Sequence, residues 1–136
     1  GGVAQESGAT ARLTQEDVDT IRARIPGVAD VSSNVNGRVQ VTYLNKNWNT
    51  QIQGVSAAYA EMRASKPDRG RFFSEDENRQ RTRVAVIGTT LVRELFGNAN
   101  PLGEMIKINK ISFQVIGVLP EKGANGWRDQ DDVILI

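Results

Sequence analysis

The stretch GNANPLGEMIKINKISFQVIGVL, residues 97–119, contains the strongest folding signal in the chain. Apolar and polar residues alternate on both sides of Asn109-Lys110, which predicts two strands that each have one apolar face. A two-residue turn at this dipeptide joins them into a hairpin. We expect this hairpin to anchor the core, because four apolar side chains then share one face, with Ile108 opposite Ile111 and Ile106 opposite Phe113.

The end of the same stretch, residues 115–119, is apolar on both faces of the predicted strand. We therefore expect it to be the most buried strand of the protein. Upstream, residues 84–87 predict a short apolar strand. Residues 90–96 predict a helix with one buried side, which Gly97 ends.

The rest of the chain predicts one more helix and several strands. Residues 15–24 have apolar side chains at helical spacing, with Thr14 as the N-cap and Pro26-Gly27 after the last turn. Turn signals at Asn36-Gly37 and at residues 45–47 separate the strands of a small antiparallel meander. These strands are predicted at 29–35, 39–43 and 48–55, and a last strand is predicted at 132–136.

Three polar segments connect these elements. Residues 57–76 predict irregular or partly helical structure, in which Phe72 and Phe73 enter the core while the arginines beside them stay in water. Residues 75–83 change from acidic to basic and predict an exposed loop or a short helix. Residues 120–131 predict a long polar loop.

The composition is that of a globular domain and excludes several kinds of chemistry. Of 136 residues, 39% are hydrophobic and 24% are charged, and the net charge of +1 provides no basic field for nucleic acid. The chain has no cysteine and no histidine, so it lacks thiolate nucleophiles, disulfides and the usual general base. We therefore expect a protein that is not an enzyme; a hydrolase would depend on carboxylates, lysines or tyrosines alone.

Two motifs suggest a bound ion, and each has a simpler explanation. The acidic run at residues 129–132 lacks the central glycine and the later glutamate of an EF-hand calcium loop, so we expect a solvated loop. Gly88 lies between a strand and a helix N-terminus, a geometry that can hold an anion. No phosphate-loop motif accompanies it, and a tight strand-to-helix turn is the better interpretation. We expect no metal and no cofactor in this chain.

Both ends of the sequence suggest a piece of a longer protein. Residues 1–9 are mostly small and polar and predict a flexible linker, whereas the sequence ends inside the apolar run at residues 133–136. No apolar run approaches the roughly 20 residues that a membrane-spanning helix needs.

An ordered set of sequence blocks resembles a known family. The blocks are NW at 47–48, IQGV at 52–55, RGRFF at 69–73, VAVIG at 84–88, LFG at 95–97, NPLG at 100–103, IKIN at 106–109, FQVIGVL at 113–119 and QDDVI at 130–134. In this order and at these spacings they resemble the MacB-like periplasmic core domain of FtsX-like ABC transporter permeases, of the macrolide-exporter type. The resemblance covers about residue 13 to residue 136.

This resemblance implies an α+β fold in two parts. After the linker at residues 1–9, residues 10–35 would form the first half of an incomplete porter-like α/β subdomain. Residues 36–136 would form a mostly β, sabre-like subdomain containing one helix. The second porter half is expected after residue 136, which leaves the porter sheet with an exposed edge.

The resemblance also implies a non-catalytic role in the periplasm, or on the extracellular face of the membrane. In this family the domain lies between the first two transmembrane helices, contacts a membrane-fusion adaptor and transmits motion driven by ATP. The expected partners are this adaptor, a second permease copy and a separate ATPase domain or subunit. No nucleic acid is expected, and the membrane is reached through helices outside this chain. Family membership does not fix the transported substrate.

The candidates for partner contact are Trp127, Arg128 and Asp129. An aromatic residue next to an arginine, in a polar and glycine-rich loop, has the composition of an interface hot spot. The alternative is that Trp127 folds back and caps the core. An alternative function is an extracytoplasmic ligand- or substrate-binding module, in which aromatic stacking would come from Tyr43, Trp48, Tyr59 and Trp127.

Overall fold

The computed structural model describes residues 37–53, 67–80, 82–125 and 128–136, and the structural statements below refer to these residues. The linker predicted at 1–9, the porter half predicted at 10–35, and the helix and strand predicted within that half lie outside them. Strands predominate among the described residues and only short helices accompany them, so the fold is mixed α+β.

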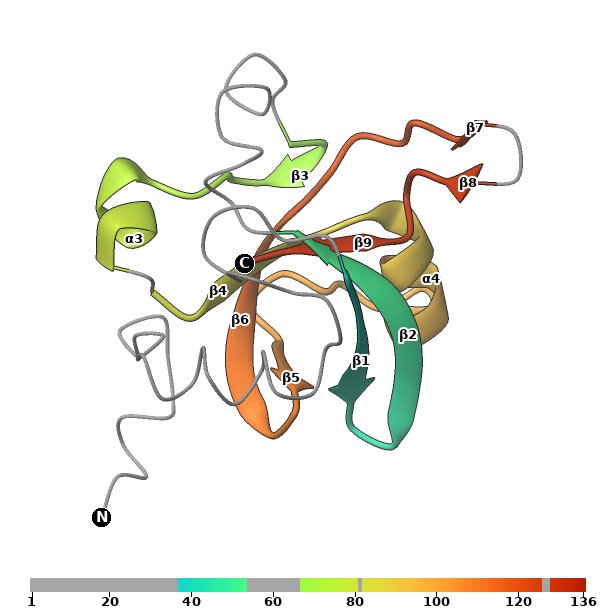
Figure 1. Ribbon diagram of the computed structural model, residues 1–136, viewed down its shortest axis with the longest axis horizontal. Helices are drawn as coiled ribbons and strands as arrows, with labels where there is room; N and C mark the ends of the chain where they lie inside the picture. The colour runs from blue at the N-terminus through green and yellow to red at the C-terminus, as the bar shows by residue number, and fades with distance from the viewer. Residues whose placement is uncertain (1–36, 54–66, 81, 126–127) are drawn as a thin grey trace.

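The described residues form nine strands and two helices (Figure 1). The strands are β1 Gly37–Tyr43, β2 Lys46–Gln53, β3 Arg69–Gly70, β4 Val84–Ile87, β5 Met105–Ile108, β6 Ile111–Val118, β7 Ala124–Asn125, β8 Arg128–Asp129 and β9 Val133–Leu135. The helices are α3 Glu75–Gln80 and α4 Thr89–Phe96. Neither of these helices has the length and apolar character needed to cross a bilayer.

Six of the strands form a closed ring, in which hydrogen bonds join each strand to two neighbours. Their order is β6-β4-β9-β2-β1-β5, and β5 pairs again with β6. The pairs β4–β6 and β2–β9 are parallel and the others are antiparallel, while β3 pairs with the far end of β6. Each strand of the ring therefore has a partner on both sides, which protects its backbone groups from pairing with another chain.

The β5–β6 hairpin has the predicted register. Ile108 lies opposite Ile111 and Ile106 lies opposite Phe113. The turn residues Asn109 and Lys110 have φ values of 50° and 71°, as in a type I′ turn, whose twist matches that of the flanking strands. The hairpin prediction from the sequence is confirmed.

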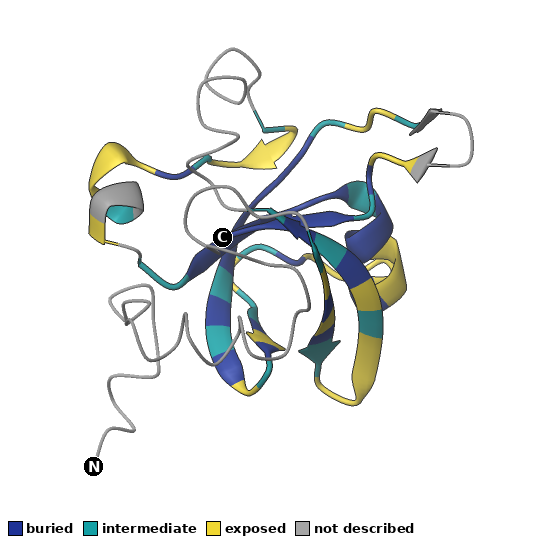
Figure 2. Cartoon of the chain, in the orientation of Figure 1, coloured by how far each residue is buried: buried dark blue, intermediate teal, exposed yellow. Residues whose placement is uncertain are grey.

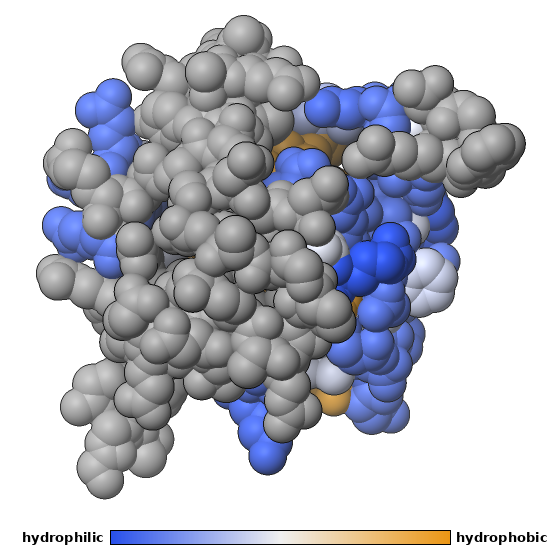
Figure 3. Space-filling view, viewed as in Figure 1, coloured by the Kyte–Doolittle hydropathy of each residue, from blue (hydrophilic) through white to orange (hydrophobic). Residues whose placement is uncertain are grey.

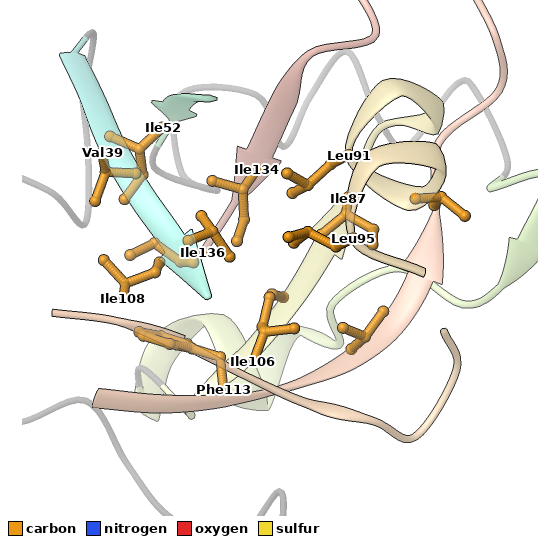
Figure 4. Close-up of a cluster of buried hydrophobic side chains, with 14 of the residues drawn as sticks. Val39, Ile52, Ile87, Leu91, Leu95, Ile106, Ile108, Phe113, Ile134 and Ile136 are labelled. Atoms are coloured by element: carbon orange, nitrogen blue, oxygen red, sulfur yellow. The ribbon is translucent and has the colours of Figure 1, made fainter. Parts of the chain in front are cut away.

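The interior of the ring is one apolar cluster (Figure 4). Alternate residues of each strand point into it, and α4 adds Leu91 and Leu95. Almost fully buried members from the strands are Val41, Ile52, Ile87, Ile106, Ile108, Phe113 and Ile134. The predicted helix at 90–96 is thus confirmed, with its apolar side in the core and Gly97 after its last residue.

A second apolar cluster lies on the other face of β4, β6 and β9. It consists of Phe73, Val84, Val86, Ile116, Leu119, Val133 and Leu135, with Phe72 packed against it. These three strands are therefore buried on both faces, as the sequence predicts for residues 115–119, whereas β1 and β2 carry exposed residues along one face (Figure 2). Arg69 and Arg71 beside the phenylalanines are exposed, as predicted.

The acidic-to-basic segment begins with a short helix, α3. Ser74 and Glu77 form a capping box: the Ser74 hydroxyl accepts a hydrogen bond from the Glu77 N–H, and the Glu77 carboxylate accepts one from the Ser74 N–H. The guanidinium of Arg71 bonds both carboxylate oxygens of Glu77 at 2.7 and 2.9 Å, which holds the pKa of Glu77 below its usual value. Of the two predicted alternatives, the short helix is correct for residues 75–80.

The turn predicted at residues 45–47 is wrong in position. Leu44 and Asn45 form the turn, and Lys46 and Asn47 already belong to β2, opposite Tyr43 and Thr42. The two asparagines favour a turn by their residue type. The pairing of β1 with β2, however, includes Asn47 and Lys46, so Asn45 alone of the predicted segment lies in the turn.

Candidate partner-contact site

Two of the predicted contact residues, Arg128 and Asp129, form strand β8, which pairs with β7 in a small hairpin. Asn125 pairs with Arg128 and Ala124 pairs with Asp129. Trp127 lies outside the described residues. Figure 1 shows the hairpin projecting from the ring at the upper right. The segment predicted to be a loop at 120–131 therefore contains short strands.

The carboxylate of Asp131 joins the two arms of this hairpin at their base. It accepts hydrogen bonds from the backbone N–H groups of Lys122, at 2.7 Å, and Gly123, at 2.9 Å. The Gln130 N–H also donates to the Gly123 carbonyl at 3.2 Å. Asp131 is only 6% exposed, so these donors replace the water that the carboxylate would otherwise need.

The carboxylate of Asp129 joins the hairpin to α4. One oxygen accepts a hydrogen bond from the Thr90 hydroxyl at 2.6 Å, and the other accepts one from the Asp131 N–H at 2.9 Å. The Thr90 hydroxyl and then the Asp131 amide stabilise the charged form, so they hold the pKa of Asp129 below its usual value. Asp129, predicted as a contact residue, therefore also fixes the direction in which the hairpin leaves the ring.

Gly88 allows this loop to approach the first turn of α4. The Gly88 N–H donates to the Val133 carbonyl and the Thr90 N–H donates to the Asp131 carbonyl, at 2.9 and 3.2 Å. A Cβ atom on Gly88 would lie 2.0 Å from the Asp131 carbonyl oxygen, a distance that no side chain can occupy. This close packing supports the interpretation of Gly88 as a tight turn, with the loop before β9 lying against the helix N-terminus.

Asp132 joins the same loop to the ring through β2. Its Oδ1 accepts hydrogen bonds from the Trp48 indole N–H at 3.0 Å and from the Thr50 hydroxyl at 2.6 Å. Arg38 on β1 lies 3.9 Å from Oδ2. Thr50 is fully buried, so its hydroxyl depends on this carboxylate as a partner.

Each of the three aspartates is therefore occupied by donors of the protein itself. No group of three or more acidic side chains with the arrangement of a metal site occurs in the part of the chain that the structure describes. The arrangement of the three carboxylates links neighbouring segments of the chain. It gives a projecting hairpin a fixed base, with separate attachments to α4, to its own arms and to β2.

Comparison with known proteins places the chain in one family. The model of the MacB-like periplasmic core domain matches residues 1–136. The macrolide export ATP-binding/permease protein MacB of Bdellovibrio bacteriovorus is 65% identical over 136 residues, which are 100% of this chain and 21% of that protein. The protein of the same name from Chlorobium luteolum is 50% identical over 135 residues, 99% of this chain and 20% of that protein. The chain spans about a fifth of the length of these curated relatives.

A solved structure has the same fold. The periplasmic region of MacB from Actinobacillus actinomycetemcomitans superposes with a TM-score of 0.61 at 25% identity, covering 99% of this chain and 59% of that chain. The chain belongs to the family of MacB-like periplasmic core domains. The family resemblance of the sequence blocks is therefore confirmed.

Proposed function

We propose that this chain is the extracytoplasmic domain of an ABC exporter permease and that it contacts a membrane-fusion adaptor. It is non-catalytic and couples motion driven by ATP to export. The observation that carries the proposal is the family match over the whole chain, together with relatives that are named macrolide export ATP-binding/permease proteins. The domain lies in the periplasm or on the extracellular face, as part of an inner-membrane protein whose ATPase and membrane helices are outside this chain.

The proposal includes a division into two subdomains. Residues 36–136, which contain the strand ring and the β7–β8 hairpin, are the sabre-like part, and residues 10–35 are the first half of the porter-like part. A second permease copy is the other partner within the transporter. The domain itself uses no cofactor.

The β7–β8 hairpin is the proposed contact with the adaptor. Its base is held by Asp129, Asp131 and Asp132, so a force on its tip is passed to α4 and β2 through short hydrogen bonds. A hairpin held in this way loses little conformational entropy when a partner binds. Tryptophan and arginine, the types of residues 127 and 128, are among those that dominate interface energetics.

The contact is tested with the full-length transporter and its cognate purified adaptor. Trp127→Ala and Arg128→Ala are expected to weaken adaptor binding about tenfold each without a change in Tm, because each replaces a large side chain of a type common at interface hot spots. Glu121→Ala, at an exposed position before the hairpin, is the matched control and should bind normally. Unchanged affinity with a large drop in Tm for Trp127→Ala would assign that residue to the core.

The coupling role is tested by loosening the base of the hairpin and leaving its tip intact. Thr90→Val removes the hydroxyl that bonds Asp129 but keeps the shape of the side chain. We expect unchanged adaptor affinity and a lower amount of export per ATP hydrolysed, with Thr89→Val as the control. Normal export per ATP in Thr90→Val would show that the fixed base is not needed for coupling.

A further inference from the structure

The turn between β1 and β2 combines two features that oppose folding. Leu44 is 84% exposed, and it is the exposed large hydrophobic residue of the described part of the chain. It also has a φ of 54°, a left-handed conformation that is unusual for a bulky side chain. Of the two turn residues it alone has a positive φ, the pattern of a type II′ turn, in which glycine is preferred at this position.

Packing within the chain does not explain Leu44. A side chain with this exposure has little contact with the core, and asparagine or glycine would take the same backbone conformation more easily. The β5–β6 turn has an asparagine at the equivalent first position. Residues held in unfavourable backbone conformations occur mainly at functional sites, so the strained position is a reason to look for a function of this leucine.

The surroundings of Leu44 are polar. Asn45, Lys46 and Asn47 are exposed next to it, and Asn47 is bonded across the hairpin to the Gln40 side chain. Further along, the guanidinium of Arg38 bonds the Asn49 side chain. The face shown in Figure 3 is also mostly hydrophilic where it is coloured, with only small hydrophobic patches. Singly exposed apolar side chains are common on protein surfaces, so the left-handed backbone of Leu44, together with its exposure, distinguishes this position.

The charges beside the turn are positive. Lys46 lies opposite Tyr43 in the hairpin, and Lys107 of β5 lies opposite Thr42; both lysines are exposed. The nearby carboxylate of Glu104 accepts a hydrogen bond from the Tyr43 hydroxyl at 2.6 Å and is partly buried. A surface that complements this turn therefore offers an apolar pocket with carboxylates at its edge.

We infer that Leu44 is the apolar anchor of a second contact with the adaptor, inserted into a pocket that carboxylates surround. The inference rests on the proposed function, since it takes the adaptor as the partner. A lipid surface fits less well, because the amides and the arginine along β1 and β2 would lose their hydration in hydrocarbon, whereas at a protein surface they lie in a hydrated rim. The turn and the β7–β8 hairpin lie at separate places on the ring, at the bottom and the upper right of Figure 1.

The first test measures affinity for the purified cognate adaptor with the full-length transporter. Leu44→Asn keeps a residue that tolerates positive φ and removes the anchor, so we expect about tenfold weaker binding and an unchanged or higher Tm. Leu44→Met keeps an apolar side chain and should bind within about threefold of the parent protein. Lys110→Asn, at the turn of the other hairpin, is the matched control. Unchanged affinity of Leu44→Asn, or a loss that Leu44→Met shares in full, overturns the inference.

The second test identifies what lies against the turn. A photoreactive p-benzoylphenylalanine is placed at position 44 of the full-length transporter in cells and, in a separate variant, at position 125 in β7. A cross-link from position 44 to the adaptor supports the inference. A cross-link to phospholipid, a cross-link to a second permease copy, or no cross-link overturns it. If position 125 alone reaches the adaptor, only this inference fails; if neither position does, the proposed adaptor contact fails with it.

Discussion

The β5–β6 and β1–β2 hairpins have turns of the same length but different turn chemistry. At the β5–β6 turn, Asn109 and Lys110 both have positive φ, and asparagine suits its position well. At the β1–β2 turn the residue with positive φ is Leu44, which has neither a short polar side chain nor cover from the core. The residue at the first position of the β5–β6 turn is therefore explained by folding, whereas the residue at the first position of the β1–β2 turn is not.

The strands of the two hairpins also differ in how much of their surface is buried. β6 is buried at most positions and half-buried at the others, and β5 exposes Lys107, whereas β1 and β2 bury one face and expose amides, an arginine and a lysine on the other. Where turn preference, alternation and burial agree, the residues of a hairpin need no further explanation. Where they disagree, as at Leu44, the disagreement indicates a requirement outside folding.

The largest effect should come from the core side of the β5–β6 hairpin. Phe113 is 1% exposed, and Phe113→Ala is expected to lower the free energy of unfolding by about 3–5 kcal/mol, because it leaves a cavity inside the ring. Urea denaturation measures this change. Gln40→Ala, on the exposed face of β1, is the control and should change stability by less than about 0.5 kcal/mol. A loss below about 1 kcal/mol for Phe113→Ala would show that this hairpin does not anchor the core.

A smaller effect is expected where β2 meets the loop before β9. Asp132→Ala leaves the buried Thr50 hydroxyl without its acceptor and should cost about 1–3 kcal/mol. Thr50→Val removes the donor, so the double variant should lose less than the sum of the two single losses. Strict additivity in this double-mutant cycle would contradict the coupling between the two side chains.

Glycine substitutions at the two turns distinguish an effect on folding from an effect on adaptor binding. Lys110→Gly and Leu44→Gly each relieve a left-handed side chain, and each should raise the free energy of unfolding by roughly 0.5–1 kcal/mol after the entropy cost of glycine. The turns should differ in adaptor binding, which only Leu44→Gly weakens. Destabilisation by Leu44→Gly would mean that this side chain has a folding role.

The smallest effect is expected at alkaline pH and concerns the end of β1. The hydrogen bond from the Tyr43 hydroxyl to Glu104 raises the pKa of Tyr43 above 10.0. Below the unfolded-state pKa both states are protonated and the contribution of the bond to stability is complete. As the pH rises through the folded-state pKa, this contribution is lost. The fall in Tm between about pH 8 and about pH 11 should therefore be smaller in Tyr43→Phe than in the parent chain, and an identical fall would contradict it.

Local patterns predicted the elements whose partners are close in sequence. The β5–β6 register and the buried side of α4 follow from alternation, turn residues and a terminal glycine within residues 84–119. The closure of the ring was not predictable, because β9 lies between β4 and β2 and both neighbours are distant in the chain. The turn at Leu44 was missed because asparagines are the more usual turn residues and two of them follow it.

The sequence predicts the residue types of the candidate site but not its structure. The sequence indicated a polar loop with Trp127, Arg128 and Asp129, but not the partners that hold the loop in place. Trp48 and Thr50 bond Asp132 across 84 and 82 residues, and Thr90 bonds Asp129 across 39. No local pattern specifies contacts over such separations, whereas the family resemblance, which depends on ordered blocks along the chain, was sufficient to identify the class of domain.

The position of β9 in the ring also sets the order in which the strands of the ring become available during synthesis. Thr50 and Asp132 are 82 residues apart, so at about 5–20 residues per second the first hairpin is synthesised roughly 4–16 s before the strand that pairs with it. During this interval Ile52 lacks Ile134, the residue that lies beside it in the finished domain. Closure of the ring is therefore a late event that depends on contacts between residues far apart in the sequence. Translation pauses before β9 should increase misfolding more than equal pauses after it.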